Sequence, residues 1–217
     1  TFALGPKGNL AIGGFYSKDQ QFSIAGTFFF SLDGETKQVL ASGLMAFETD
    51  FLIQFMNEKN VEKGQELTDF YFDKVIMVAE QYFLTEHVVT DPYTGVRTVS
   101  YFHNYYDIIM IKVNKEGTIA WANRIPKRQS TSGDKGAYSS YILHSGKDKT
   151  YLMFNDHQEN KNILANDKNA KLKTYTNQKK SETVFVQVSS NGGVLREALF
   201  NRGDSETALK TGLYFQT

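Results

Sequence analysis

The sequence predicts an all-β fold made of repeated antiparallel units, with one amphipathic helix inserted between strands. Short segments rich in Val, Ile, Phe and Tyr alternate with turn residues, as strands and their connections do. Pairs of such segments also recur at one common spacing, and each copy contains a tight turn with Gly. A chain of 217 residues is long enough for a domain with a sizeable core. We therefore expect residues 1–217 to form a single domain or a portion of one.

Strand signals run along most of the chain. The segments are short, apolar or alternating, and are bounded by Gly, Asn, Asp or Lys. The expected strands are Asn9–Ser17, Phe22–Leu32, Lys74–Leu84, Thr150–Asp156 and Thr183–Ser190.

One segment has the helical period instead. Phe47, Phe51 and Phe55 recur at every fourth position, which predicts an amphipathic helix over residues 50–59 with Thr49 or Asp50 as its N-cap. A helix that packs its Phe stripe on the sheets is favoured over a helix that binds a partner.

Two long polar stretches predict loops, Thr85–Asn104 and His157–Glu182. The second is crowded with Lys and Asn, so a solvated, mobile excursion is the simplest interpretation. A lysine-rich binding patch is the weaker alternative, because acidic residues lie between the lysines.

Self-comparison of the sequence indicates a repeat. When Gly117 is placed on Gly192, Ile109 and Ile111 fall on Val184 and Val186. The same offset places the strand that begins at Ile76 on the strand that begins at Tyr151. A weaker third copy lies upstream and includes Gly34. The expected units are residues 9–47, 74–126 and 150–200.

The shared Gly has a physical reason. A tight connection between antiparallel strands usually needs a residue with positive φ, which Gly adopts without a Cβ clash. Gly34, Gly117 and Gly192 are therefore interpreted as turn residues. Trp121 follows the second turn, where its ring is expected to fill space between packed sheets rather than to bind a ligand. The third unit departs from the pattern, since Arg196 stands in the place of Trp121.

Antiparallel units that recur at this length are typical of β-propeller blades. The stretch DIIMIKVNKEGTIAW (residues 107–121) resembles the D-x-x-x-x-K-x-N-x-x-G-x-I-x-W blade repeats of an uncharacterised family of exported β-propeller-like proteins of Bacteroidota. The resemblance implies a propeller-like fold and an extracytoplasmic location, either periplasmic or at the cell surface. It carries over no catalytic motif. About three blades are visible, whereas a propeller needs at least four, so we expect the chain to be part of a larger propeller.

Composition excludes several classes of function. Lys plus Arg equals Asp plus Glu at 24 each, so no net charge draws the chain to nucleic acid. There is no Cys for disulfides, thiolate catalysis or metal ligation. No apolar run is long enough to span a bilayer as a helix. The chain starts at Thr1, which predicts a processed protein or a fragment.

Chemistry-bearing motifs are scarce. The four histidines lack metal-ligand spacing, and no nucleophile elbow or P-loop is present. We expect no cofactor and no metal, and the sequence leans away from an enzyme without excluding one. The stretch SGDKGAYSS (residues 132–140) contributes Lys135 to a small basic spot with Lys127 and Arg128.

Candidate ligand-binding residues lie where inner strands end and where aromatic side chains gather. In a propeller, polar side chains at inner-strand ends can face the central channel, although hydrogen bonding to neighbouring loops is the favoured role. Aromatic rings beside His and Asn suit sugar stacking or a protein interface. The candidates are Glu80, Gln81, Asn155, Asp156, His103, Tyr105 and Tyr106.

Two functions remain open from the sequence. The favoured one is a non-catalytic scaffold that binds another protein at the bacterial cell envelope. The alternative is a propeller that binds or cleaves glycans at its channel mouth.

Overall fold

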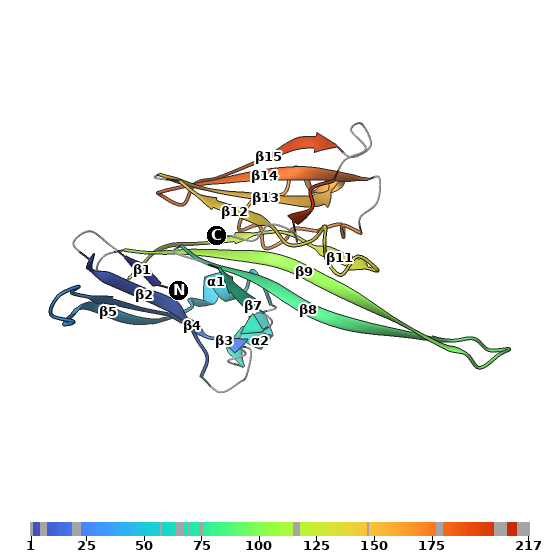
Figure 1. The fold of residues 1–217 in the computed structure, drawn as a ribbon, viewed down its shortest axis with the longest axis horizontal. Coiled ribbons are helices and arrows are strands. Elements are labelled where there is room, and N and C mark those ends of the chain that lie inside the picture. The colour runs from blue at the N-terminus through green and yellow to red at the C-terminus, as the bar shows by residue number, and fades with distance from the viewer. Residues whose placement is uncertain are drawn as a thin grey trace. The chain divides into compact units, whose positions relative to one another are not determined.

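The computed structural model shows an all-β protein built from antiparallel sheets, which confirms the predicted class (Figure 1). Among the strands that the structure describes, no sheet closes on itself. The structure describes residues 2–4, 8–18, 23–56, 58–63, 67–68, 70–73, 76–114, 118–146, 148–176, 180–201 and 208–211.

The chain divides into two compact units, each assembled from separate stretches of sequence. Unit 1 comprises Thr1–Gln81, Ile108–Ile125 and Ala165–Ala170, and unit 2 comprises Tyr82–Asp107, Pro126–Leu164 and Lys171–Thr217. The boundary falls within two long strands, β8 and β9, which each contribute residues to both units. That the whole chain belongs to one propeller-like domain stays a prediction.

The first sheet belongs to unit 1 and has the order β1-β2-β4-β5. Its strands are Phe2–Leu4 (β1), Leu10–Tyr16 (β2), Gly26–Leu32 (β4) and Val39–Ala46 (β5). Two of the expected strands are thereby confirmed. At the turn between β4 and β5 the residue with positive φ is Lys37, at 62°. Gly34 is expected to supply a positive φ at this turn, but glycine is needed there for another reason. A Cβ at position 34 would overlap the backbone of Gly8.

The second sheet has the order β10-β9-β8-β7, with β11 also pairing with β9. Its strands are Phe70–Asp73 (β7), Met77–Thr90 (β8), Arg97–Val113 (β9), Ile119–Ile125 (β10) and Gln129–Ser132 (β11). The expected loop over residues 85–104 is wrong, because most of it continues β8 and β9. Asp91 closes the short turn by accepting hydrogen bonds from the backbone N–H groups of Tyr93 and Thr94.

The third sheet belongs to unit 2 and has the order β12-β13-β14-β15. Its strands are Ile142–Ser145 (β12), Lys149–His157 (β13), Ser181–Ser189 (β14) and Val194–Asn201 (β15). Gly192 has φ of 87° in the turn before β15, as predicted from its place in the repeat. Leu152, Phe154, Val184 and Val186 are fully buried and form the core face of this sheet.

The expected helix over residues 50–59 is broken into two short pieces, Thr49–Leu52 (α1) and Glu58–Glu62 (α2). The N-cap of α1 is Glu48, whose side chain makes no capping hydrogen bond. After α1 the backbone N–H groups of Gln54 and Phe55 bond to carbonyls three residues back, so three-residue and four-residue bonds mix there and the regular α-helix does not continue. Residue 57 lies outside the described residues.

The Phe stripe nevertheless packs as predicted. The rings of Phe47 and Phe51 lie 5.0 Å apart between centroids, and those of Phe51 and Phe55 lie 5.2 Å apart. Phe47 and Phe51 join Phe15, Ile24, Met77, Ala79, Ile109 and Ile111 in the buried core of unit 1. A two-stranded pairing of Ser23–Ile24 (β3) with Leu67–Thr68 (β6) completes this unit.

The polar segment from His157 to Glu182 keeps many exposed side chains but is anchored to the fold by a few buried residues. Its first turn is the 3₁₀ helix Gln158–Asn160 (η2), and Asn160 is fully buried. Tyr175 is 1% exposed, and its backbone bonds to Arg128 and Ser130. Buried amide and backbone pairing therefore orders a stretch whose composition alone suggests disorder. Residues 177–179 lie outside the described part.

The first and third sheets have four strands each and the second has five, and in each sheet a run of four strands follows the chain order, with β11 of the second sheet lying off that run. The aligned residues Ile109, Ile111, Val184 and Val186 are all fully buried. Trp121 lies on β10 opposite Lys112 and is only partly buried, so it is not an enclosed wedge. Gly117 lies outside the described residues. That the units are copies of one blade stays a prediction.

Candidate functional site

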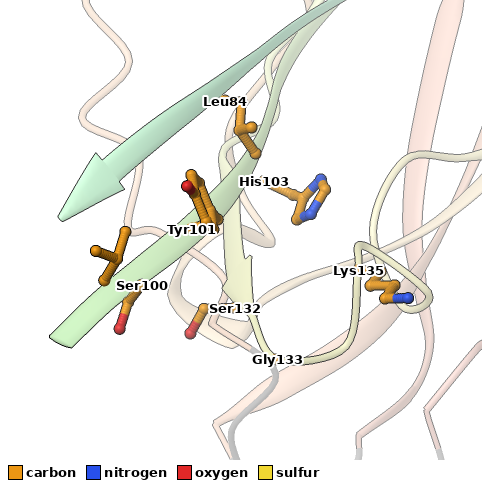
Figure 2. A pocket seen from close by; sticks show the side chains of 8 residues that line it. Leu84, Ser100, Tyr101, His103, Ser132, Gly133 and Lys135 are labelled. Carbon is orange, nitrogen blue, oxygen red and sulfur yellow. The ribbon is translucent and has the colours of Figure 1, made fainter.

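An open groove in unit 2 is a candidate site. Its volume is about 670 Å³. Strands β8, β9 and β11 and the loop after β11 line it (Figure 2), through residues Leu84, Val99, Ser100, Tyr101, His103, Ser132, Gly133 and Lys135.

The pairing of β11 with β9 builds one side of the groove. Ser132 pairs with Phe102, and Thr131 pairs with His103. Tyr101 and His103 stand two residues apart on β9 and therefore project to the same face. In Figure 2 His103 projects from β9 towards the side where the loop carries Lys135. The lining thus combines strand residues with a loop that β11 leads into.

His103 is held in place by neighbouring rings. Its Nδ1 lies 3.0 Å from the Tyr82 hydroxyl. The ring of Tyr82 packs on that of Tyr105, with 4.7 Å between centroids. A Cβ at Gly136 would lie 2.7 Å from the Tyr105 hydroxyl oxygen, so the loop approaches this ring as closely as a glycine allows.

The loop itself is fixed by its own hydrogen bonds. Asp134 Oδ1 accepts from the backbone N–H of Gly136 at 3.0 Å, and the Asp134 carbonyl accepts from Ala137. Gly133, Lys135 and Gly136 have φ values of 79°, 53° and 78°. A non-glycine residue in this region is strained, and such residues cluster at functional sites.

The predicted site residues separate into distinct surroundings. Only His103 lines the groove, while Tyr105 lies behind it. Tyr106 packs edge-on against Phe83, and the Arg128 guanidinium lies 4.8 Å from its ring centroid.

Glu80 and Gln81 belong to unit 1, where they pair with Tyr71 and Phe70 of β7. Glu80 is 6% exposed. Asn155 and Asp156 belong to unit 2.

Asn155 is bound within the fold. Its Nδ2 donates to the carbonyls of Tyr138 and Leu209, at 2.9 and 2.6 Å. Its Oδ1 accepts from the Thr183 hydroxyl and from the backbone N–H of Leu209. These four hydrogen bonds join strands and a distant segment, which is the structural role that the sequence favoured for this residue.

Asp156 forms a buried ion pair with Arg196. Its other oxygen accepts from Asn160 Nδ2 at 2.7 Å and from the backbone N–H of His157 at 2.8 Å. The Arg196 guanidinium also lies 5.4 Å from the Phe154 ring centroid and donates to the Pro126 carbonyl. In the aligned repeat Arg196 stands in the place of Trp121. The third sheet therefore has a buried ion pair at the position where the second sheet has an aromatic ring.

Glu182 pairs with Asp156 across β13 and β14. Burial raises the pKa of Glu182, and the negative charge of Asp156 raises it further. Burial also raises the pKa of Asp156, while Arg196 opposes that shift. Two carboxyl groups thus share one buried region, where Arg196 pairs with Asp156 and Lys161 also lowers the pKa of Glu182.

The sequence missed several residues of these sites. It grouped Lys135 with Lys127 and Arg128, but Lys127 is fully buried and donates to Gln129 Oε1 at 2.9 Å and the Tyr105 carbonyl at 3.1 Å. The Tyr101 contribution was visible only as one ring in an aromatic run. Arg196 could have been singled out from the sequence, since it interrupts an otherwise aligned repeat.

Within the described part of the chain, no group of three His, Asp or Glu side chains is arranged to hold a metal ion. The described helices are too short and polar to cross a membrane.

No protein-family model, curated protein or solved structure matches this chain, so its function is argued from the geometry above.

Proposed function

We propose that this protein is a non-catalytic, propeller-like scaffold of the bacterial cell envelope that binds another protein through the β8–β9 hairpin. The observation that carries the proposal is the exposure of this hairpin. Every residue from 84 to 99 is exposed to solvent, and we call this stretch the arm. An isolated two-stranded ribbon is marginally stable in water, so a long one is expected to pack against something.

The arm displays apolar side chains. They lie on both strands and in the turn, and comprise Leu84, Val88, Val89, Tyr93, Val96 and Val99. Tyr93 in the turn is 96% exposed. Aromatic side chains are enriched at protein interfaces, which suits the exposed Tyr93.

A protein fits the arm better than a lipid surface or a nucleic acid. The charged residues of the arm are Glu86, Asp91 and Arg97, and Arg97 lies 3.8 Å from Glu86. No cationic cluster is available to attract phosphates. Backbone groups at the edges of the ribbon can also pair with a strand of the partner.

The scaffold part of the proposal rests on topology and resemblance. Three sheets that each contain a run of four strands in chain order suit consecutive propeller blades. Further blades are needed to close such a ring. The envelope location follows from the resemblance to exported Bacteroidota proteins.

Site-specific photo-crosslinking tests the proposal. A photoreactive amino acid replaces Tyr93, and in a matched control it replaces Leu164, which is also highly exposed in unit 2 at 72%. Crosslinking in intact cells of a bacterium that makes the protein should give one identified partner from position 93 and not from position 164. Val89→Glu should abolish that product, because a charge on the arm opposes burial.

Two results would contradict the proposal. Identical products from both positions would show that the arm has no preferred partner. A crosslink only to a second copy of the chain would replace a scaffold for another protein with self-association.

A further inference from the structure

We propose that the groove at the base of the arm binds an acidic saccharide, with its carboxylate held by Lys135 and His103. This inference does not depend on a protein partner for the arm. It identifies a second, separate ligand and the residues that recognise it.

The lining of the groove contains a cationic residue and no acidic one. Of the eight residues that line the groove, Lys135 is cationic, none is acidic, and His103 has a ring nitrogen, Nε2, that donates a hydrogen bond in the tautomer whose Nδ1 accepts from Tyr82. Among the described residues, the Lys135 amine has no hydrogen-bond or ion-pair partner. The neighbouring Asp134 is turned into its own loop, where Oδ1 accepts from Gly136 and Oδ2 is buried. The groove lining therefore favours a ligand with an anionic group, which Lys135 can bind by a charge-assisted hydrogen bond.

The remaining lining suits a sugar ring. Tyr101 is 52% exposed and offers an aromatic ring on which the apolar C–H face of a pyranose can stack. Leu84 and Val99 extend that apolar surface. The hydroxyls of Ser100 and Ser132 can both donate and accept, as sugar hydroxyls require.

The groove is formed in advance of binding. His103 is oriented by Tyr82, Tyr82 packs on Tyr105, and Tyr105 supports the loop at Gly136. Lys135 is held at a φ of 53° by a loop with its own hydrogen bonds. Such preorganisation lowers the entropy that a ligand must lose on binding. Because the groove is open, a longer saccharide can continue beyond the bound unit.

A peptide that ends in an apolar residue also carries a carboxylate next to an apolar body. The two serine residues of the lining and the open groove favour the saccharide, and peptide binding is one of the outcomes of the test.

Calorimetry with oligomers of galacturonic and glucuronic acid tests the inference on the whole chain. Neutral oligomers of galactose and glucose serve as controls, together with a peptide that ends in Leu. We expect saturable binding of the uronates alone. Lys135→Met should weaken it by roughly tenfold or more, which is what one charge-assisted hydrogen bond is worth. Lys168→Met, at an exposed lysine of unit 1, should leave binding unchanged.

Tyr82→Phe adds a readout specific to the positioning of His103. It removes the hydroxyl at His103 Nδ1 and keeps the ring that packs on Tyr105. We expect weaker uronate binding together with a changed chemical shift of the His103 ring. Equal affinity for neutral sugars, binding of the peptide alone, or no binding by the folded protein would each overturn the inference. Val89→Glu should lose the partner crosslink and keep uronate binding, so the two proposals fail separately.

Discussion

The β13–β14 pair and the arm of β8–β9 are both antiparallel ribbons, yet they use their side chains in opposite ways. On β13 and β14, Leu152, Phe154 and Val184 are fully buried, and Asp156 is enclosed with its cation. In the arm every residue is exposed, including apolar ones. Burial is what makes a strand pair stabilise a fold. The first ribbon therefore supports the fold, and the second has surface to offer a partner.

The largest effect that distinguishes the two ribbons is expected at Arg196. Arg196→Met leaves the buried Asp156 without its cation, and breaking a buried pair in this way costs about 3–5 kcal/mol of unfolding free energy. Denaturant unfolding measures it. The double variant Asp156→Asn with Arg196→Met should recover much of the loss, because no buried charge is left alone. Arg128→Met, which removes an exposed guanidinium over Tyr106, should cost about 1 kcal/mol or less.

Two glycines provide a matched pair. Gly192 and Gly95 have φ values of 87° and 69°, so alanine is strained at both positions. In the turn between β14 and β15, Gly192→Ala should lower the global unfolding free energy by roughly 1–2 kcal/mol. Gly95→Ala should leave it unchanged, because the arm can open locally without the core. Equal losses in denaturant unfolding would show that the arm is part of the cooperative fold.

The titration of Glu182 on β14 should make the unfolding free energy depend on pH. Because its pKa is raised in the folded protein, its folded state holds the proton more tightly than its unfolded state. The contribution of protonated Glu182 to the unfolding free energy is therefore complete below the pKa of the unfolded state. It is lost as the pH rises through the pKa of the folded state. Glu182→Gln should raise stability at neutral pH and flatten this decline. A variant that is less stable at neutral pH would show that the ionised carboxylate stabilises the fold.

The smallest effect on stability is expected within the arm. Val89→Thr keeps a β-branched residue on an exposed strand, so the unfolding free energy should change by less than about 0.5 kcal/mol. The same substitution should weaken crosslinking from position 93. A clear loss of stability with intact crosslinking would reverse the roles assigned to the two ribbons.

The buried strands were predictable and the arm was not. Segments such as Thr150–Asp156 can be recognised as strands in the sequence, because a strand with one buried face needs apolar residues on that face. Neither face of the arm is buried, so polar and apolar residues mix and the stretch has the composition of a loop. The β-branched residues Val88, Val89 and Val99 were the available signal for strand.

The candidate sites show the same limit. His103 was named from its aromatic surroundings, but Lys135 joins it only because β11 pairs with β9. Asp156 and Arg196 lie far apart in sequence and meet through the strand order of the third sheet. Local patterns predict strands, whereas long-range pairing decides which side chains meet.

Replacing residues 86–101 with an Asn-Gly turn separates the binding role of the arm from any role in stability. The measurement is the unfolding free energy of the shortened protein, paired with a competition assay in which it challenges the full-length crosslink from position 93. We expect an unfolding free energy within about 0.5 kcal/mol of the parent and no competition, because the arm contributes binding rather than stability. A shortened protein that unfolds would show that the arm stabilises the fold, and one that still competes would show that the partner binds elsewhere.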